Sequence, residues 1–88
     1  MNTFVATGEI LDPSRVTDGL RAEEDKVLAD LHEAGIVRNA YLHEDHRSVT
    51  LVLTLPDFSA ASAAMSRLPF VQLGIIKFSY ATVRSILP

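Results

Sequence analysis

The sequence predicts an α+β domain whose elements follow the order β-α-β-β-α-β, and three observations lead to this prediction. Residues 16–31 and 58–68 place apolar side chains three and four positions apart, a spacing typical of helices. Four stretches rich in β-branched and aromatic residues surround these two segments. The chain has 88 residues and is 48% hydrophobic, which suits a single globular domain over residues 1–88.

The first strand and the first helix are predicted from the N-terminal third of the chain. The strand should cover residues 3–11, with the sequence TFVATGEIL. A long helix should follow from Pro13 to about Ala34, because Asp12 is a good N-cap and proline fits the first helical position. Gly35 should end this helix in the left-handed conformation.

The second and third strands are expected at residues 36–44 and 47–55, joined through the polar stretch HEDH at residues 43–46. Two imidazoles and two carboxylates could ligate zinc, but the spacing of His43 and His46 matches no metal motif. Polar residues are also common at hairpin tips because these tips face solvent. We therefore predict a polar turn and no metal site.

A shorter helix and a last strand complete the predicted order. The helix should begin within PDFS, residues 56–59, and end at Leu68 before a proline. The last and longest strand should cover residues 70–83, with a bulge or bend at Gly74. An antiparallel four-stranded sheet with both helices on one face is the ferredoxin-like arrangement.

The last strand also bears on the oligomeric state, because both of its sides read as apolar. One side would carry Phe70, Ile76, Phe78 and Tyr80, and the other Val71, Leu73, Ile75, Ala81 and Val83. Two helices on one face cannot cover both sides. An uncovered apolar face exceeds what a soluble monomer normally exposes. We therefore expect a homodimer, or a higher homo-oligomer, packed sheet to sheet as a dimeric α+β barrel.

Composition excludes several classes of function. The sequence has no cysteine, so thiolate catalysis and cysteine-ligated metals are excluded. A net charge of −3 without a basic cluster argues against a nucleic-acid partner. No apolar run reaches the length of about 18 residues that a membrane span needs, and no signal peptide is visible, so a cytoplasmic protein is expected. No phosphate loop or nucleotide fingerprint is present, and no cofactor is expected.

Glu24 is the residue with the most informative position. The apolar stripe of the first helix consists of Val16, Leu20, Val27, Leu28 and Leu31. At 100° per residue, Glu24 falls inside this stripe, between Leu28 and Leu31. A carboxylate there is costly unless it is paired, hydrogen-bonded or protonated, and desolvation should raise its pKa towards the range of a general base. Alternatively, Glu24 lies at the margin of the apolar stripe, or it forms a structural ion pair with Arg38 or Arg84.

Three further side chains are candidates for a site. His46 lies near the start of the third strand, and an imidazole can transfer protons at neutral pH. Arg38 could hold a substrate carboxylate, or it could form a salt bridge to Glu33. Tyr41 lies on the same predicted strand as Arg38 but has the opposite parity, so at most one of the two should share a face with a given site.

Several short segments together resemble the muconolactone isomerase family, a group of small dimeric α+β-barrel proteins. The resemblance runs from about Phe4 to Val83. It rests on the Asp12-Pro13 pair, LRAEE at 20–24, LHEAGIVRNAY at 31–41, His46, LPDFSA at 55–60 and RLPFVQL at 67–73. The order and spacing of these segments are more specific for the fold of the family than for its reaction.

The resemblance implies an activity and roles for three residues. The family shifts a double bond in an unsaturated lactone, as part of aromatic catabolism, by removing and returning protons without a metal or an organic cofactor. Glu24 would then carry the proton and His46 would act as an acid or enolate donor. Arg38 would anchor the carboxylate of the lactone. Tyr41 is a candidate substrate contact by its position on the strand, and with Val37 it stands where tryptophans are common in the family. The sequence departs from the family pattern at Asp25, where a lysine is typical.

Three functions therefore remain open from the sequence. The first is a cofactor-free isomerase acting on a small unsaturated lactone. The second is a barrel protein that binds a small apolar metabolite without turnover, or that serves as an accessory subunit. The third is a cofactor-independent monooxygenase acting on quinol-like substrates, which rests on analogy of fold alone.

Overall fold

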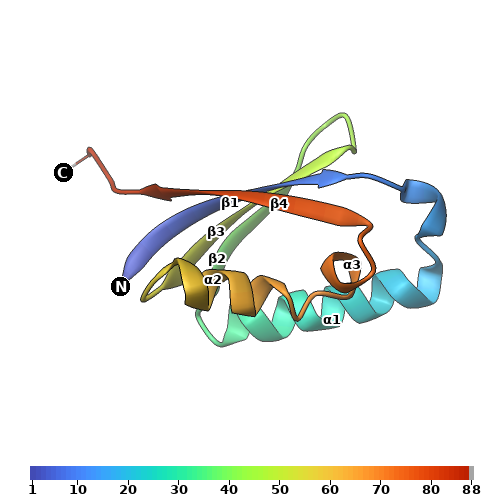
Figure 1. The fold of residues 1–88 in the computed structure, drawn as a ribbon, viewed down its shortest axis with the longest axis horizontal. Helices are drawn as coiled ribbons and strands as arrows, with labels where there is room; N and C mark the ends of the chain where they lie inside the picture. The colour runs from blue at the N-terminus through green and yellow to red at the C-terminus, as the bar shows by residue number, and fades with distance from the viewer. Residues whose placement is uncertain (88) are drawn as a thin grey trace.

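In the computed structural model, which describes residues 1–87, a four-stranded antiparallel sheet is packed against three helices (Figure 1). The strands are β1 (Asn2–Ile10), β2 (Val37–Leu42), β3 (Ser48–Leu55) and β4 (Ile76–Val83). The α-helices are α1 (Asp18–Glu33), α2 (Phe58–Met65) and α3 (Pro69–Gln72), and a 3₁₀ turn, η1, covers Pro13–Arg15. The strand order is β2-β3-β1-β4, and the helices lie on one face. The α+β prediction is confirmed, and the arrangement is compatible with a ferredoxin-like fold.

The first helix begins later than the sequence predicted. Thr17 is its N-cap, and the Thr17 Oγ1 atom accepts a hydrogen bond of 3.1 Å from the backbone N–H of Leu20. Asp12 makes no side-chain capping bond, and Pro13 opens only the 3₁₀ turn. Val16 has an extended backbone and separates this turn from α1. Because the threonine supplies the capping acceptor, the predicted long helix is divided into two pieces.

The C-terminus of α1 is the glycine stop that the sequence predicted. Gly35 has a φ of 79°, in the left-handed region that favours glycine. Its N–H donates to the carbonyl of His32, and the N–H of Ile36 donates to the carbonyl of Leu31, both at 3.0 Å. These two bonds form a Schellman motif, which reverses the chain into β2.

The same motif ends α3, in a segment that the sequence assigned to a strand. Gly74 has a φ of 70°. Its N–H donates to the carbonyl of Val71 at 3.1 Å, and the N–H of Ile75 donates to the carbonyl of Phe70 at 2.9 Å. The prediction of a strand over residues 70–83 is therefore wrong in its first part, and β4 begins at Ile76.

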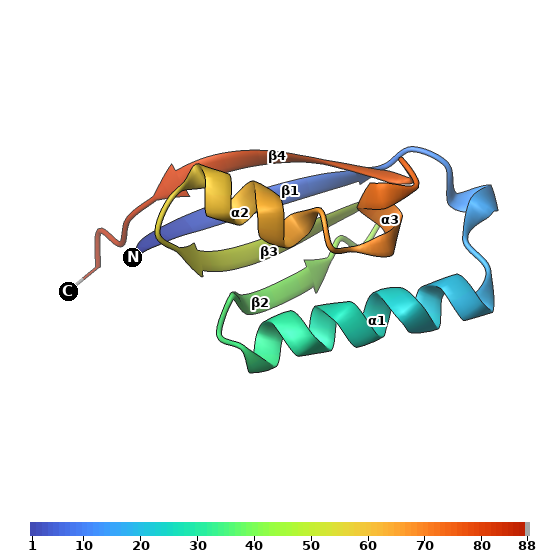
Figure 2. The ribbon, with the colours of Figure 1, turned by 60° about the horizontal axis from the view of Figure 1, so that its bottom comes forward.

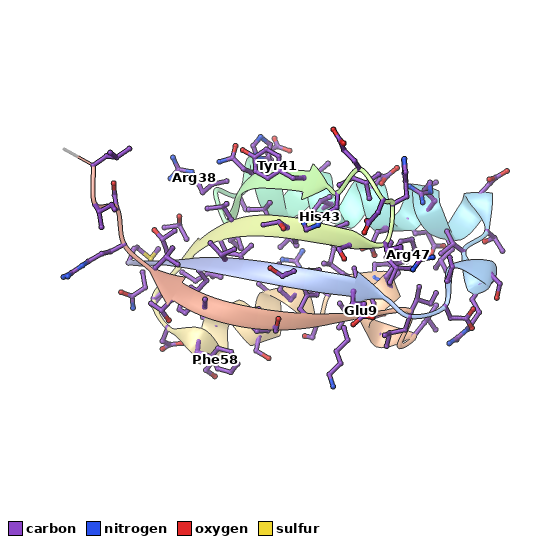
Figure 3. The ribbon with its side chains drawn as sticks, turned by 90° about the horizontal axis from the view of Figure 1, so that it is seen from above. Glu9, Arg38, Tyr41, His43, Arg47 and Phe58 are labelled. Atoms are coloured by element: carbon purple, nitrogen blue, oxygen red, sulfur yellow. The ribbon has the colours of Figure 1, made fainter. Side chains whose placement is uncertain are left out.

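This correction changes the open face of the sheet, onto which Figure 3 looks. Ile75 is fully buried in the core instead of facing outward. On β4 the outward positions are Lys77, Ser79, Ala81 and Val83, and they pair in register with Glu9, Thr7, Val5 and Thr3 of β1. The outward side of β3 carries Ser48, Thr50, Val52 and Thr54. The open face therefore consists mainly of small and polar side chains. Ala81 and Val83 face outward as predicted, but Val71, Leu73 and Ile75 precede β4, so the predicted apolar side is much smaller than expected.

The core lies between the sheet and the helices in two clusters. The larger contains Phe4, Ala6, Leu31, Val37, Leu51, Leu53, Leu55, Ala61, Ala64, Met65 and Leu68. The smaller contains Phe70, Ile75 and Ile76. Of the α1 residues only Leu31 is fully buried. Figure 2 shows α1 lying along the β2 edge of the sheet, where the rest of its apolar stripe is half-buried beside a pocket.

Candidate functional site

A pocket of about 270 Å³ lies between α1, α3 and the helix-covered face of the sheet. Most of its wall is apolar and comes from Leu28, Leu42, Leu51, Phe70, Ile76 and Phe78. The volume is near the lower end of the range of small-molecule sites in proteins. A concave apolar surface with few polar groups is suited to a small, mainly apolar ligand.

Gly8 shapes the floor of this pocket. It pairs with Phe78 of β4 and Val49 of β3, and all three face the helices. A Cβ atom at Gly8 would lie 2.6 Å from Phe78 Cε1 and 2.8 Å from Ile76 Cδ1. The missing side chain therefore gives Phe78 room to lie flat on the sheet, and a larger residue would push two lining side chains towards the cavity.

Glu24 is half-buried and lines the pocket, as its position in the apolar stripe predicted. Its Oε1 atom accepts a hydrogen bond of 2.9 Å from the backbone N–H of Phe70. The pKa of Glu24 is raised, because burial desolvates the carboxylate, and nearby Asp25 adds to this effect. The Phe70 N–H and the charge of Arg21 act in the opposite direction but do not cancel the rise.

The bond from Phe70 gives Glu24 a structural task as well. Phe70 is the second residue of α3, and Leu68, the N-cap of that helix, provides no side-chain acceptor. Helix N-termini leave their first N–H groups without intrahelical partners. The Glu24 carboxylate, 46 residues away in the sequence, accepts one of these N–H groups and so links α3 to α1.

Tyr41 and Arg38 lie at different sites. Tyr41 is one of the residues around the pocket, whereas Arg38 lies in an adjoining hollow beside His32, which shares Asp25, Leu28 and Ala40 with the pocket. The register of β2 shifts between Val37 and Asn39, so Arg38 falls at an irregularity of the strand. Tyr41 borders the pocket from β2, but it pairs with Thr50, so its side chain points to the open face and not towards Glu24. Arg38 is not among the residues that line the pocket.

Arg21 and Asp25 are the polar lining residues that the sequence reasoning did not select. Both are exposed and flank Glu24 on α1. Arg21 is three residues before Glu24, and side chains three apart on a helix are neighbours. This spacing is the signal that could have identified Arg21.

His46 lies in the turn between β2 and β3, which projects away from the helices (Figure 1). Its φ is 59°, a left-handed conformation that non-glycine residues adopt mainly in turns. Its N–H donates to the carbonyl of His43 at 2.9 Å, and its side chain is exposed. His46 does not line the pocket of Glu24. Glu24 and His46 therefore do not share one cavity, although the joint roles that the resemblance implies would require it, because the hairpin extends beyond the sheet.

Two other residues of the HEDH stretch, Asp45 and His43, make hydrogen bonds in or beside the turn. The Asp45 Oδ1 atom accepts the Arg47 N–H at 2.9 Å, and His43 Nε2 lies 2.6 Å from Thr50 Oγ1. Within residues 1–87, no three His, Cys, Asp or Glu side chains are grouped in a way that could hold a metal ion. In the same range, no helix is long and apolar enough to cross a membrane.

The fold and the pocket together define an α+β protein with a small, mainly apolar cavity whose wall includes the half-buried carboxyl group of Glu24. No family model and no curated protein sequence matches the chain.

Proposed function

We propose that the protein is a cofactor-free isomerase that moves a double bond within a small unsaturated lactone. The observation that carries this proposal is the Glu24 carboxyl group, which is half-buried in the wall of an otherwise mainly apolar pocket. The resemblance to the muconolactone isomerase family favours the same reaction. A raised pKa supports it further, because a carboxylate with a higher pKa is a stronger base towards a weakly acidic carbon.

In the proposed reaction a single carboxyl group both removes and returns the proton. The Glu24 carboxylate takes a proton from the carbon next to the conjugated system, and the C–H electron pair moves into the substrate to give a dienolate. The protonated Glu24 then donates the proton to the other end of the dienolate, which leaves the double bond shifted.

A second function, binding of a small apolar molecule without turnover, is favoured by one specific observation. The Oε1 atom of Glu24 already accepts the Phe70 N–H, so the carboxylate has a role in the fold even without a reaction. His46 also lies outside the pocket and offers no second proton-transfer group there. In this case the protein would bind a small apolar molecule in the pocket, and Glu24 would serve only the fold.

The test compares lactone isomerisation by the wild type, Glu24→Gln and His46→Asn, followed by ultraviolet absorbance on a set of small unsaturated lactones. Glutamine keeps a carbonyl oxygen for the Phe70 N–H but cannot accept a proton from carbon. We therefore expect Glu24→Gln to lower the rate by about 10²- to 10⁴-fold. His46→Asn should retain the wild-type rate, because asparagine tolerates the left-handed turn and His46 lies outside the pocket.

Full activity in Glu24→Gln would contradict the assigned base. Loss of activity in His46→Asn would restore the role that the sequence suggested for this histidine. If the wild type binds the lactones but converts none of them, the binding function replaces the isomerase.

A further inference from the structure

A second hollow, of about 400 Å³, adjoins the pocket on the side of β4. It lies between α2, α3 and β4, and its wall includes Val71 and Tyr80. Of the residues that the structure describes, only Ile76 and Phe78 line both the pocket and this second hollow. These two side chains of β4 therefore form the partition between the two spaces.

Phe78 is the part of this partition that faces a ligand most directly. Ile76 is only 4% exposed and belongs to the smaller core cluster, whereas Phe78 is half-buried. The edge of the Phe78 ring lies directly over Gly8, since a Cβ atom there would be 2.6 Å from Cε1 and 2.9 Å from Cδ1. On β4, the ring centroid of Tyr80 lies 6.4 Å from that of Phe78. The ring of Phe78 is therefore held between two neighbours and closes the pocket at β4.

The closed pocket is small, and its charges do not favour an acidic ligand. Its volume of about 270 Å³ is near the lower end of the range of small-molecule sites. The charged side chains in its wall are Arg21, Glu24 and Asp25, so both signs are present. The rest of the wall is mainly apolar. Size and shape should therefore separate ligands more strongly than charge does.

We propose that Phe78 is the specificity residue of the pocket and that it restricts the ligands to uncharged lactones of a single ring. This inference rests on the proposed function, because the lactone would occupy the pocket beside Glu24. A second ring fused to the lactone would meet the phenyl group of Phe78. Without that phenyl group, the second ring would extend into the adjoining hollow, towards Tyr80.

The test uses α-pyrone and coumarin as probes, because they share one unsaturated lactone ring and coumarin adds a fused benzene ring. Binding is followed by nuclear magnetic resonance shifts of the backbone amides, which also locate the site. The wild type should bind coumarin no more tightly than α-pyrone, although the added ring brings more apolar surface to bury. Phe78→Ala should raise the affinity for coumarin relative to α-pyrone by about ten-fold, with new shifts at α2.

Two further variants make the result specific to Phe78. Phe58→Ala also removes a phenyl group, but Phe58 lines neither the pocket nor the second hollow, so this variant should keep the wild-type ratio of affinities. Phe78→Leu keeps an apolar side chain at the partition and decides the question if Phe78→Ala does not fold. It should change the ratio in the same direction as Phe78→Ala, because leucine is smaller than phenylalanine.

The outcomes separate this inference from the proposed function. Tighter binding of coumarin than of α-pyrone by the wild type, or a ratio that stays unchanged in the folded Phe78 variants, would overturn the role of Phe78 and leave the pocket proposal intact. A change of the ratio in Phe58→Ala equal to that in the Phe78 variants would also overturn it. Absence of shifts at the pocket with both probes would overturn the proposed function together with this inference.

Discussion

Glu24 combines two roles that a single carboxyl group rarely holds together. It caps the N-terminus of α3 through Phe70, and it faces a cavity that can hold a small molecule. The Oε1 atom accepts the N–H of Phe70, and the same side chain is part of the pocket wall. Its raised pKa follows mainly from burial, so it reflects the same environment that would favour proton transfer.

The raised pKa of Glu24 predicts how stability depends on pH. Between its ordinary value of 4.5 and the higher pKa in the folded state, the folded protein binds more protons at Glu24 than the unfolded chain does. The contribution of Glu24 to the free energy of unfolding therefore falls as pH rises through this window. Glu24→Gln cannot ionise, so it should gain stability relative to the wild type as the pH rises above the ordinary value of 4.5. Urea denaturation at several pH values measures this difference.

The matched control is Glu23→Gln, which removes a charge from the exposed neighbour on α1. Glu23→Gln should not show a gain in stability over the wild type that grows with pH. A difference between wild type and Glu24→Gln that stays constant over the whole range would contradict the raised pKa.

At the scale of elements, α1 and α3 end in the same way, although the sequence predicted only the glycine stop of α1. Gly35 closes α1 and Gly74 closes α3, each with a positive φ and the same pair of backbone hydrogen bonds. The second stop places Phe70 in the pocket wall and starts β4 at Ile76. The shape of the pocket thus depends on a glycine that does not line it.

Alanine substitutions at two glycines should have opposite effects on stability. Gly74→Ala should lower the free energy of unfolding by about 1–2 kcal/mol, because a Cβ atom disfavours the left-handed conformation at φ 70°. Gly19→Ala should raise it by about 0.5–1 kcal/mol, since Gly19 lies in α1 and a Cβ there meets no atom within 4 Å. Denaturant unfolding of both variants measures the effects, and equal effects at the two positions would contradict the assignment of α3.

At the scale of the whole molecule, the open face of the sheet remains the predicted surface for self-association, on different grounds from those in the sequence. Its side chains are mainly threonine, serine, valine and alanine, with Glu9 and Lys77 side by side near one end. Small side chains allow two sheets to approach closely, at the spacing of about 10 Å found in sandwiches. We propose that two copies pack through this face.

Light scattering after gel filtration tests this proposal. The wild type should have twice the mass of the 9.6 kDa chain. Val52→Lys should shift it to the monomer, because Val52 lies on the open face of β3, between Thr50 and Thr54. Ala63→Lys, at an exposed position of α2, should leave the dimer intact. A monomeric wild type, or equal behaviour of the two variants, would contradict packing through the sheet.

The sequence by itself determined the order of most elements, the glycine stop after α1 and the position of Glu24 in the apolar stripe. These features depend on local signals, namely periodicity, caps and residues suited to positive φ, and such signals act within a few positions of the chain. The candidate base was identified for the same reason, since its burial follows from the angular position of one residue on one helix.

The tertiary structure alone decided the start of β4, the composition of the open face and which polar residues share the pocket. Residues 70–75 are apolar enough for a strand, and they form a helix and turn because Glu24, distant in sequence, accepts the Phe70 N–H while Gly74 supplies the left-handed stop. His46 was misplaced because the course of a hairpin is set by its turn, and Arg21 was missed because pocket membership depends on how α1 lies against the sheet. Contacts between distant segments set these outcomes, and local sequence patterns do not encode them.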